Sequence, residues 1–215
     1  MPRGCRCPRR AALEPPRAGG PPRRSNRSMG NEVGRASMKP FGTLVDAVTG
    51  RTVPNIGPEE NRQAVERLLL GEKGYRREEI TVDHPIEVTV RGVPYRSHLH
   101  LLVRVDGRAA LAVSCVAGSV VSWERMAVAA ARLAAETIVP LAVVSDGRTA
   151  LVVDAATGGR IGEGLEAIPS RAQWQARFAA ARPARLDPGR REREALVFRS
   201  YDSDRVNVPP PAGKP

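Results

Sequence analysis

Apolar and polar positions begin to alternate at residues 43–53, where LVDAVTGRTV surrounds a Thr-Gly turn signal. This alternation predicts a short hairpin or an extended entry segment. A helix is predicted next, from Pro58 to Gly71, because its apolar residues recur at steps of three and four. These apolar residues are Ala64, Val65, Leu68 and Leu69. We therefore expect a hairpin followed by one amphipathic helix.

Glu60 is the candidate functional residue of this helix. It lies four and eight residues before Ala64 and Leu68, so the helical repeat places it toward the buried side. A carboxylate is rarely buried unless something nearby needs its charge. We therefore expect Glu60 to contribute to a site.

Three strand candidates follow the helix, at residues 80–90, 98–105 and 109–115. Each is rich in β-branched or other apolar residues. The dipeptide Asp106-Gly107 joins the last two and is typical of a tight hairpin turn. We expect the three strands to form a meander.

A second helix is predicted after this meander. Ser122 can cap its first turn, and apolar residues continue at helical spacing to about residue 136. Residues 140–144 are an apolar run typical of a strand that is covered on both faces. The turn signal Asp146-Gly147 leads to another strand at residues 150–154. The order helix, three strands, helix, strand predicts an α/β fold.

A glycine-rich segment at residues 155–164 contains the sequence ATGGRIGEG. It lacks the GxxxxGK[ST] order of a phosphate-binding loop, so we interpret it as a hairpin turn and a loop. The chain contains no recognisable ATPase motif. If this protein takes part in a DNA-translocating system, the motor must belong to another chain.

Two C-terminal helices complete the predicted elements. Ser170 is expected to cap a short helix that carries Trp174 and Phe178 on one face. The last helix is expected to begin at Asp187-Pro188 and to end at Tyr201.

The formal net charge of +11 is high enough to suggest nucleic-acid binding. Residues 1–37 supply +7 of this charge, through nine arginines against Glu14 and Glu32, so only +4 remains for the rest of the chain. That remainder is ordinary for one domain. The net charge therefore indicates polyanion binding only if residues 1–37 are translated in the cell.

The composition divides the chain into four expected segments. They are an arginine- and proline-rich tail at 1–37, a folded domain at 38–181, a C-terminal helix at 182–205 and a flexible tail at 206–215. We expect the native start at Met38, or else at Met29, because patterned sequence begins only there. The alternative is a basic arm that binds phosphates. The intact mass of the natively expressed protein distinguishes the two.

The three cysteines indicate neither a disulfide framework nor a metal site, because Cys5 and Cys7 lie in the tail and Cys115 lies in an apolar strand. The longest apolar runs, at residues 109–113 and 138–144, are far too short to span a membrane. We therefore expect a cytoplasmic protein that does not interact with membranes.

Several short segments occur in the order known from one protein family. They are Glu59-Glu60-Asn61-Arg62-Gln63, Gly74-Tyr75, Arg96, LAVSCVAGS on the third strand and Glu124-Arg125 before AVAAARL. Over residues 42–169 the chain resembles the N-terminal family of type I restriction enzyme R proteins. The resemblance implies a PD-(D/E)xK nuclease-like αβββαβ core, a central mixed β-sheet flanked by helices, and C-terminal helices.

In that family the second strand carries an aspartate, the third carries Glu-x-Lys, and a glutamate of the first helix often assists. The two carboxylates hold magnesium, while the lysine and the metal activate a water for attack on phosphorus. The resemblance places His100 at the aspartate, Ser114 at the glutamate and Val116 at the lysine. Glu60 corresponds to the helical glutamate.

These replacements predict the loss of cleavage chemistry. An imidazole and a hydroxyl do not compensate a divalent charge as two carboxylates do, and a valine side chain binds neither water nor phosphate. Asp106 cannot substitute, because the strand separates it from His100 by about 20 Å. We therefore expect no cofactor, and magnesium only if the metal site has moved.

His98 and His100 share one face of their strand, and a transition-metal site is conceivable if Ser114 is their neighbour across the hairpin. A transition-metal site would need a further clear ligand, so we expect these histidines to be hydrogen-bonded or exposed. Cys115 points to the other face of its strand and is expected to be a small core residue.

Three arginines are candidate phosphate contacts if the protein binds DNA. They are Arg62, Arg96 and Arg125. A solvated surface position is an equally good interpretation of Arg125.

Three functional hypotheses follow from these observations. The first is a non-catalytic nuclease-fold protein that binds DNA or a DNA-processing protein partner. The second is an active magnesium-dependent endonuclease, whose relocated site combines Glu60 with Glu87 or Glu124. The third is a structural or interaction protein that does not bind nucleic acid.

Overall fold

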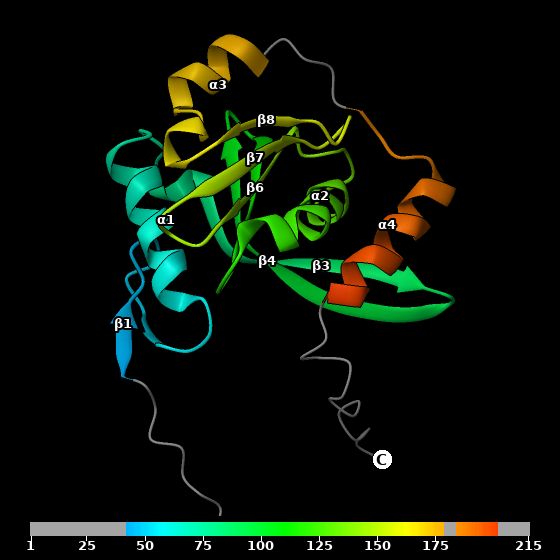
Figure 1. The fold of residues 1–215 in the computed structure, drawn as a ribbon, viewed down its shortest axis with the longest axis horizontal. Helices are drawn as coiled ribbons and strands as arrows, with labels where there is room; N and C mark the ends of the chain where they lie inside the picture. Colours follow the sequence, from blue (N-terminus) through cyan, green and yellow to red (C-terminus); the bar gives the residue numbers. More distant parts are fainter. Residues whose placement is uncertain (1–41, 179–183, 202–215) are drawn as a thin grey trace, which may run out of the picture. The chain divides into compact units, whose positions relative to one another are not determined.

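The computed structural model describes residues 42–178 and 184–201 (Figure 1). The chain divides into two units, residues 1–38 and 39–215, and every described residue lies in the second unit. The predicted tails at 1–37 and 206–215, and both predicted start sites, lie outside the described residues.

The central element is a six-stranded sheet with the strand order β3-β4-β5-β6-β7-β8. Its strands are β3 (Ile80–Val90), β4 (Val93–Val105), β5 (Arg108–Cys115), β6 (Leu141–Ser145), β7 (Ala150–Asp154) and β8 (Arg160–Glu163). The pair β5 and β6 is parallel, and the other neighbouring pairs are antiparallel. The sheet is therefore mixed, as expected.

Helices cover both faces of this sheet (Figure 1). They are α1 (Glu59–Gly71), α2 (Glu124–Leu133), α3 (Arg171–Phe178) and α4 (Pro188–Tyr201). On one face, Leu69 of α1 and Trp174 of α3 belong to the same buried cluster as Val113 of β5. On the other face, Ala130 of α2 and Phe198 of α4 belong to a second buried cluster. The order α1, β3, β4, β5, α2, β6 confirms the predicted αβββαβ core and the α/β fold class.

The N-terminal hairpin is also confirmed. It consists of β1 (Thr43–Val45) and β2 (Thr52–Pro54), which pair antiparallel in a separate two-stranded sheet. Arg77, just before β3, donates hydrogen bonds to the carbonyl oxygens of Ala47 and Val48 in the hairpin turn. These hydrogen bonds connect the hairpin turn to the 3-10 turn that precedes β3.

Strand β4 begins at Val93 rather than at residue 98. The turn before it is Arg91-Gly92, whose φ angles of 50° and 78° suit a tight hairpin without an Asn-Gly or Asp-Gly signal. Pairing of β4 with β5 begins only at Leu101. The earlier part of β4 and its partner residues in β3 therefore form a two-stranded arm beyond β5.

The glycine-rich segment contains one element that we did not predict, the edge strand β8. It is only four residues long and includes Gly162, so it has no clear alternation. Before it, the Asp154 carboxylate accepts hydrogen bonds from the backbone N–H groups of Ala156 and Thr157 at 2.8 and 3.0 Å. Because these donors are used within the turn, they do not form a phosphate cradle, in agreement with the sequence interpretation.

One predicted helix cap is wrong and another is confirmed. Ser122 lies in a 3-10 turn, Val120–Trp123, and α2 has no side-chain cap. Ser170 does cap α3, because its Oγ accepts a hydrogen bond from the Gln173 N–H at 3.2 Å. The side chain of Phe178 lies outside the described residues. Within the described ranges, no helix is long and apolar enough to cross a membrane.

Candidate functional site

The site positions predicted on the strands lie near the carboxyl end of β5. His100 Nδ1 accepts a hydrogen bond from the backbone N–H of Cys115 at 3.3 Å, so the imidazole lies against the last residues of this strand. Asn61, near the start of α1, donates a hydrogen bond from Nδ2 to the Val116 carbonyl at 2.7 Å. The fold therefore brings the start of α1, His100 and the Ser114-to-Val116 segment together.

Glu60 does not point toward the buried side, contrary to the sequence prediction. Its side chain is exposed, and its Oε1 accepts a hydrogen bond from Asn55 Nδ2 at 2.7 Å. The prediction took Ala64 and Leu68 as the centre of the buried face, but both are only half-buried. The face that α1 does bury consists of Arg62, Gln63, Val65, Glu66 and Leu69. The buried face of α1 is therefore turned about the helix axis relative to the predicted face, and Glu60 lies in solvent.

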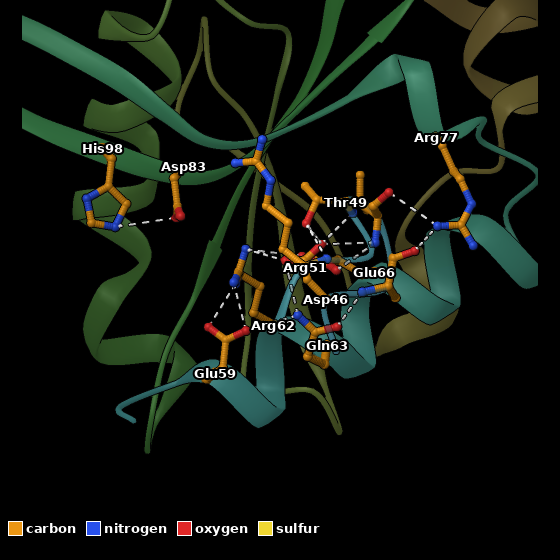
Figure 2. Close-up of polar contacts among 12 residues, drawn as sticks. Asp46, Thr49, Arg51, Glu59, Arg62, Gln63, Glu66, Arg77, Asp83 and His98 are labelled. Carbon is orange, nitrogen blue, oxygen red and sulfur yellow. Dashed lines mark hydrogen bonds and ion pairs between the residues drawn. The ribbon is translucent and has the colours of Figure 1, made fainter. Parts of the chain in front are cut away.

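The buried face of α1 carries a charged cluster together with the β1–β2 hairpin (Figure 2). We call the residues Asp46, Glu59, Arg62, Gln63 and Glu66 the Arg62 cluster. The Asp46 and Arg62 side chains are 1% and 4% exposed, and that of Glu66 is 0% exposed. Charged groups are almost never buried to this extent unless they are paired.

Arg62 contacts all three carboxylates of the cluster. Its Nε and Nη2 donate to Glu59 Oε2 and Oε1 at 3.1 and 2.7 Å, which is a two-pronged hydrogen bond. Its Nη1 lies 3.1 Å from Asp46 Oδ2 and 3.3 Å from Glu66 Oε1. Neither Nη1 nor Glu66 Oε1 has a well-aligned hydrogen bond among the described residues. The contacts of Nη1 are thus ion pairs rather than directed hydrogen bonds.

Gln63 and Thr49 complete the hydrogen bonds around Asp46. Gln63 Nε2 donates to Asp46 Oδ2 at 3.3 Å and to Glu59 Oε1 at 2.9 Å, and Gln63 Oε1 accepts from the Ala47 N–H at 2.8 Å. The backbone N–H and the hydroxyl of Thr49 donate to Asp46 Oδ1 at 2.6 and 2.9 Å. Helix α1 and the hairpin are therefore joined by polar contacts.

The protonation equilibria of the cluster differ from residue to residue. Burial, followed by the nearby charge of Asp46, raises the pKa of Glu66 to about 7. Burial also acts to raise the pKa of Asp46, but the hydrogen bonds from Thr49 and the charge of Arg62 outweigh it and lower that pKa. For Arg62, burial is outweighed by Glu59 and Glu66, which raise the pKa of the guanidinium. Arg62 is therefore a permanent cation, whereas Glu66 titrates near neutral pH.

The sequence prediction missed Asp46, Glu59 and Glu66. Glu66 could have been found, because it lies four residues after Arg62 and next to the buried Val65. Asp46 had a local signal as well, since an aspartate three residues before a threonine favours the turn that the hairpin adopts. Its partnership with α1 is a tertiary contact that has no local signal.

The two histidines of β4 lie close together on the arm. The rings of His98 and His100 are 5.6 Å apart in an edge-to-face arrangement, and His98 Nε2 lies 3.8 Å from Asp83 Oδ1 (Figure 2). In the described part of the chain, no three His, Cys, Asp or Glu residues are grouped so that they could hold a metal ion. That the histidines hold no metal ion stays a prediction.

Ser114, Val116 and Cys115 are all buried, at 2%, 4% and 1% exposed. Burial raises the pKa of the Cys115 thiol far above its usual range. Cys115 belongs to the core cluster on the α1 side, as expected of a small core residue.

The three arginines predicted to contact phosphates have different environments. Arg62 is buried in its cluster, so it is not placed as a surface contact. Arg96 is 76% exposed and forms an ion pair with Glu87 on the arm. Arg125 is 46% exposed and donates to the buried Glu194 at 2.7 Å. Of these three described arginines, Arg96 and Arg125 are exposed enough to reach an external ligand.

The acids of a relocated metal site have separate partners. Glu60 accepts from Asn55, Glu87 is paired with Arg96, and Glu124 is paired with Arg160 at 2.6 Å. Asp106 lies in the β4–β5 turn, where Arg171 contacts it at 3.1 Å, so it does not join the site either. The described donor set does not fit a magnesium ion. The matched strand positions are neutral, Glu87 and Glu124 are each paired with an arginine, and Glu60 accepts from the neutral amide of Asn55.

The comparison with protein families agrees with this architecture. The chain matches the family model "type I restriction enzyme R protein N terminus" over residues 57–169, which is more than half of its 215 residues. No curated protein and no solved structure matches it. The matched segment includes α1, the whole αβββαβ core and β8. The chain therefore belongs to the type I restriction enzyme R protein N-terminal family.

Proposed function

We propose that this protein is a nuclease-fold protein that does not cleave DNA but binds it, through exposed arginines of the β3–β4 arm and of α2. Family membership supports a role in DNA metabolism. A DNA-processing protein that docks on the same surface is the alternative outcome of the tests below.

The chemistry of three positions carries the proposal. His100, Ser114 and Val116 stand where the family resemblance places an aspartate, a glutamate and a lysine. Hydrolysis of a phosphodiester by this route requires anionic oxygens around a divalent ion. These three side chains supply an imidazole, a hydroxyl and two methyl groups. The burial of Ser114 and Val116 also keeps them away from a phosphate on the surface.

The candidate DNA contacts are the exposed guanidinium groups of Arg96 and Arg125. Both are paired with a glutamate in the free protein, and a phosphate would compete with that glutamate for the same donors. Contacts of this kind position a protein on the DNA backbone without reading the sequence.

Plasmid DNA tests the absence of cleavage. The full chain with magnesium should give no nicked or linear product above that of the Glu60→Ala variant. Robust cleavage that disappears in Glu60→Ala would overturn the proposal and would favour the relocated metal site.

Binding to a DNA duplex at several salt concentrations tests the second half of the proposal. Each phosphate contact contributes a slope of about −0.9 to a plot of log affinity against log salt. Arg96→Ala and Arg125→Ala should each reduce the slope by about one contact in the full chain. Arg185→Ala is the matched control, because Arg185 is also exposed and paired with a glutamate, Glu136. If the wild-type slope is flat, the protein does not bind DNA, and the docking of a protein partner becomes the better explanation.

A further inference from the structure

The formal charge of the chain differs sharply between the family match and the segment that follows it. The matched residues 57–169 contain thirteen arginines and lysines against fifteen aspartates and glutamates, which is a net charge of −2. Residues 170–201 contain eight arginines against three acids, which is a net charge of +5. Because attraction to a polyanion grows with the number of cations that meet it, the segment after the family match is the better candidate for such contacts.

Helix α4 carries four of these eight arginines: Arg190, Arg191, Arg193 and Arg199. Among the described residues, none of the four has a carboxylate within ion-pair distance. Glu194, one of the two glutamates of α4, is buried beside Arg125 and Arg132 and does not offset these charges. The other charges of α4 are the four arginines and the exposed Glu192, which together give +3.

Two hollows flank α4, and each is lined by one arginine of α4 and one arginine of the family-matched part. Arg190 and Arg125 line the hollow between α4 and α2, and Arg191 and Arg96 line the hollow between α4 and the β3–β4 arm. Their volumes are about 490 and 690 Å³, which leaves room for a phosphate group and its water shell at each arginine pair. Helix α4 packs against α2 and β3, on the outer side of α2 (Figure 1). The two proposed DNA contacts therefore lie on either side of one arginine-bearing helix.

The carboxylates that line the two hollows are mostly neutralised. Glu124 is paired with Arg160, and Glu87 is paired with Arg96. Glu192 is the carboxylate of these linings that has no ion pair among the described residues. The surface around α4 therefore keeps an excess of positive charge, which suits an anionic partner.

The aromatic side chains on this side of the molecule are engaged with one another. Tyr95 packs edge-on against Phe198, and the rings of Trp123 and Tyr201 are 5.8 Å apart. Of the aromatic side chains that the structure describes, none is exposed. Proteins that bind single strands without sequence preference stack bases on such side chains, whereas a duplex turns its phosphates outward, about one charge per 1.7 Å of helix axis. The surface therefore suits the backbone of a duplex.

We propose that α4 is the main DNA-contacting element of this protein, and that its arginines bind the phosphate backbone of duplex DNA together with Arg96 and Arg125. The inference rests on the proposed function and deepens it, because it assigns the principal contacts to a helix outside the family match. Asp187 Oδ1 accepts a hydrogen bond from the Arg190 N–H at 2.9 Å and so caps the helix. The donors are therefore the guanidinium groups rather than the helix end, and they contact phosphates without reading the sequence.

Duplex binding by the purified full chain at several salt concentrations tests the inference. Wild type should give a negative slope of log affinity against log salt, at about −0.9 per phosphate contact. Combined replacement of Arg190, Arg191 and Arg193 by alanine should remove at least two contacts from that slope. Residues 1–37 are present in every variant, so their contribution cancels in the comparison. A single strand of the same sequence should bind at least tenfold more weakly than the duplex.

Arg67→Ala is the matched control. Arg67 is an exposed helical arginine without an ion pair among the described residues, and it belongs to α1, which covers the opposite face of the sheet. This substitution should leave the slope unchanged. Thermal melting of each variant checks that it is folded.

The outcomes separate this inference from the proposed function. A flat wild-type slope overturns both, and a protein partner with an acidic surface then becomes the better explanation. A steep wild-type slope that the triple substitution leaves unchanged, or that Arg67→Ala lowers equally, overturns the inference alone. Equal affinity for the single strand overturns the assignment to duplex DNA. If the triple variant does not fold, Arg193→Glu at an exposed position should weaken duplex binding at least tenfold at low salt, and unchanged affinity would overturn the inference.

Discussion

Replacement of Glu66 by glutamine should change how the stability of this protein depends on pH. The side chain is fully buried, and its pKa is raised to about 7 from 4.5. Because the folded pKa lies above the unfolded one, the folded state holds the proton more tightly. The contribution of this group to stability is therefore present below about pH 4.5 and is lost as the pH rises toward about 7.

The size of the effect follows from these two pKa values. At about 1.4 kcal/mol per pKa unit, the full difference corresponds to about 3 kcal/mol. Between pH 5 and pH 8, the linkage relation gives a loss of about 2.5 kcal/mol for wild type that Glu66→Gln does not share. The titration of Asp46 does not interfere, because its pKa is lowered and it remains ionised throughout this range.

Urea unfolding of both proteins at pH 5, 6, 7 and 8 measures the effect. The free energy of unfolding of Glu66→Gln minus that of wild type should rise by about 2.5 kcal/mol across the series, whatever its value at pH 5. All other titrating groups cancel in this difference. Glu136→Gln, at an 87% exposed glutamate, should give a difference that stays flat. A flat or falling difference for Glu66→Gln would refute the reasoning about the buried carboxylate.

Three further predictions concern the packing around the core. Glu194→Gln should cost about 3 kcal/mol of unfolding free energy, because one Glu194 oxygen pairs with the buried Arg132 at 2.7 Å; an unchanged urea midpoint would contradict this. In a Cys5→Ser/Cys7→Ser background, the thiol of Cys115 should react with Ellman's reagent only in denaturant, since it is 1% exposed and its pKa is raised by burial; fast labelling of that folded variant would disprove it. Gly147→Ala should lower the melting temperature more than Gly107→Ala, because both have positive φ but only at Gly147 would a Cβ come within 3.0 Å of the backbone of α1; equal losses would argue against this contact.

Elements with strong local signals could be predicted from the sequence. Strand β3 was predicted with its observed limits, and the Asp187-Pro188 pair correctly marked the start of α4, although residues 184–187 of the wider predicted segment 182–205 are not helical. The family was also predicted, from the order of short segments, and the match over residues 57–169 confirms it. Strand β8 escaped prediction because four residues around Gly162 carry no periodic pattern.

The rotation of α1 could not be predicted from its apolar residues. The prediction assumed that apolar residues mark the buried face of an amphipathic helix. The buried face of α1 instead includes the polar residues Arg62, Gln63 and Glu66. Because Ala64 and Leu68 are apolar but only half-buried, they place the centre of the predicted buried face too close to Glu60. Burial of these polar side chains depends on the ion pair between Arg62 and Asp46 of the hairpin. This is a tertiary contact that the sequence of the helix does not reveal.

The hairpin at residues 43–54 has a practical consequence for anyone who shortens this chain. A fragment cut to the family limits, residues 57–169, would keep Arg62 and Glu66 but lose Asp46. It would also lose Glu194, the carboxylate that pairs with the buried Arg132. The smallest unit that retains its internal charge balance therefore begins before the hairpin and extends through α4.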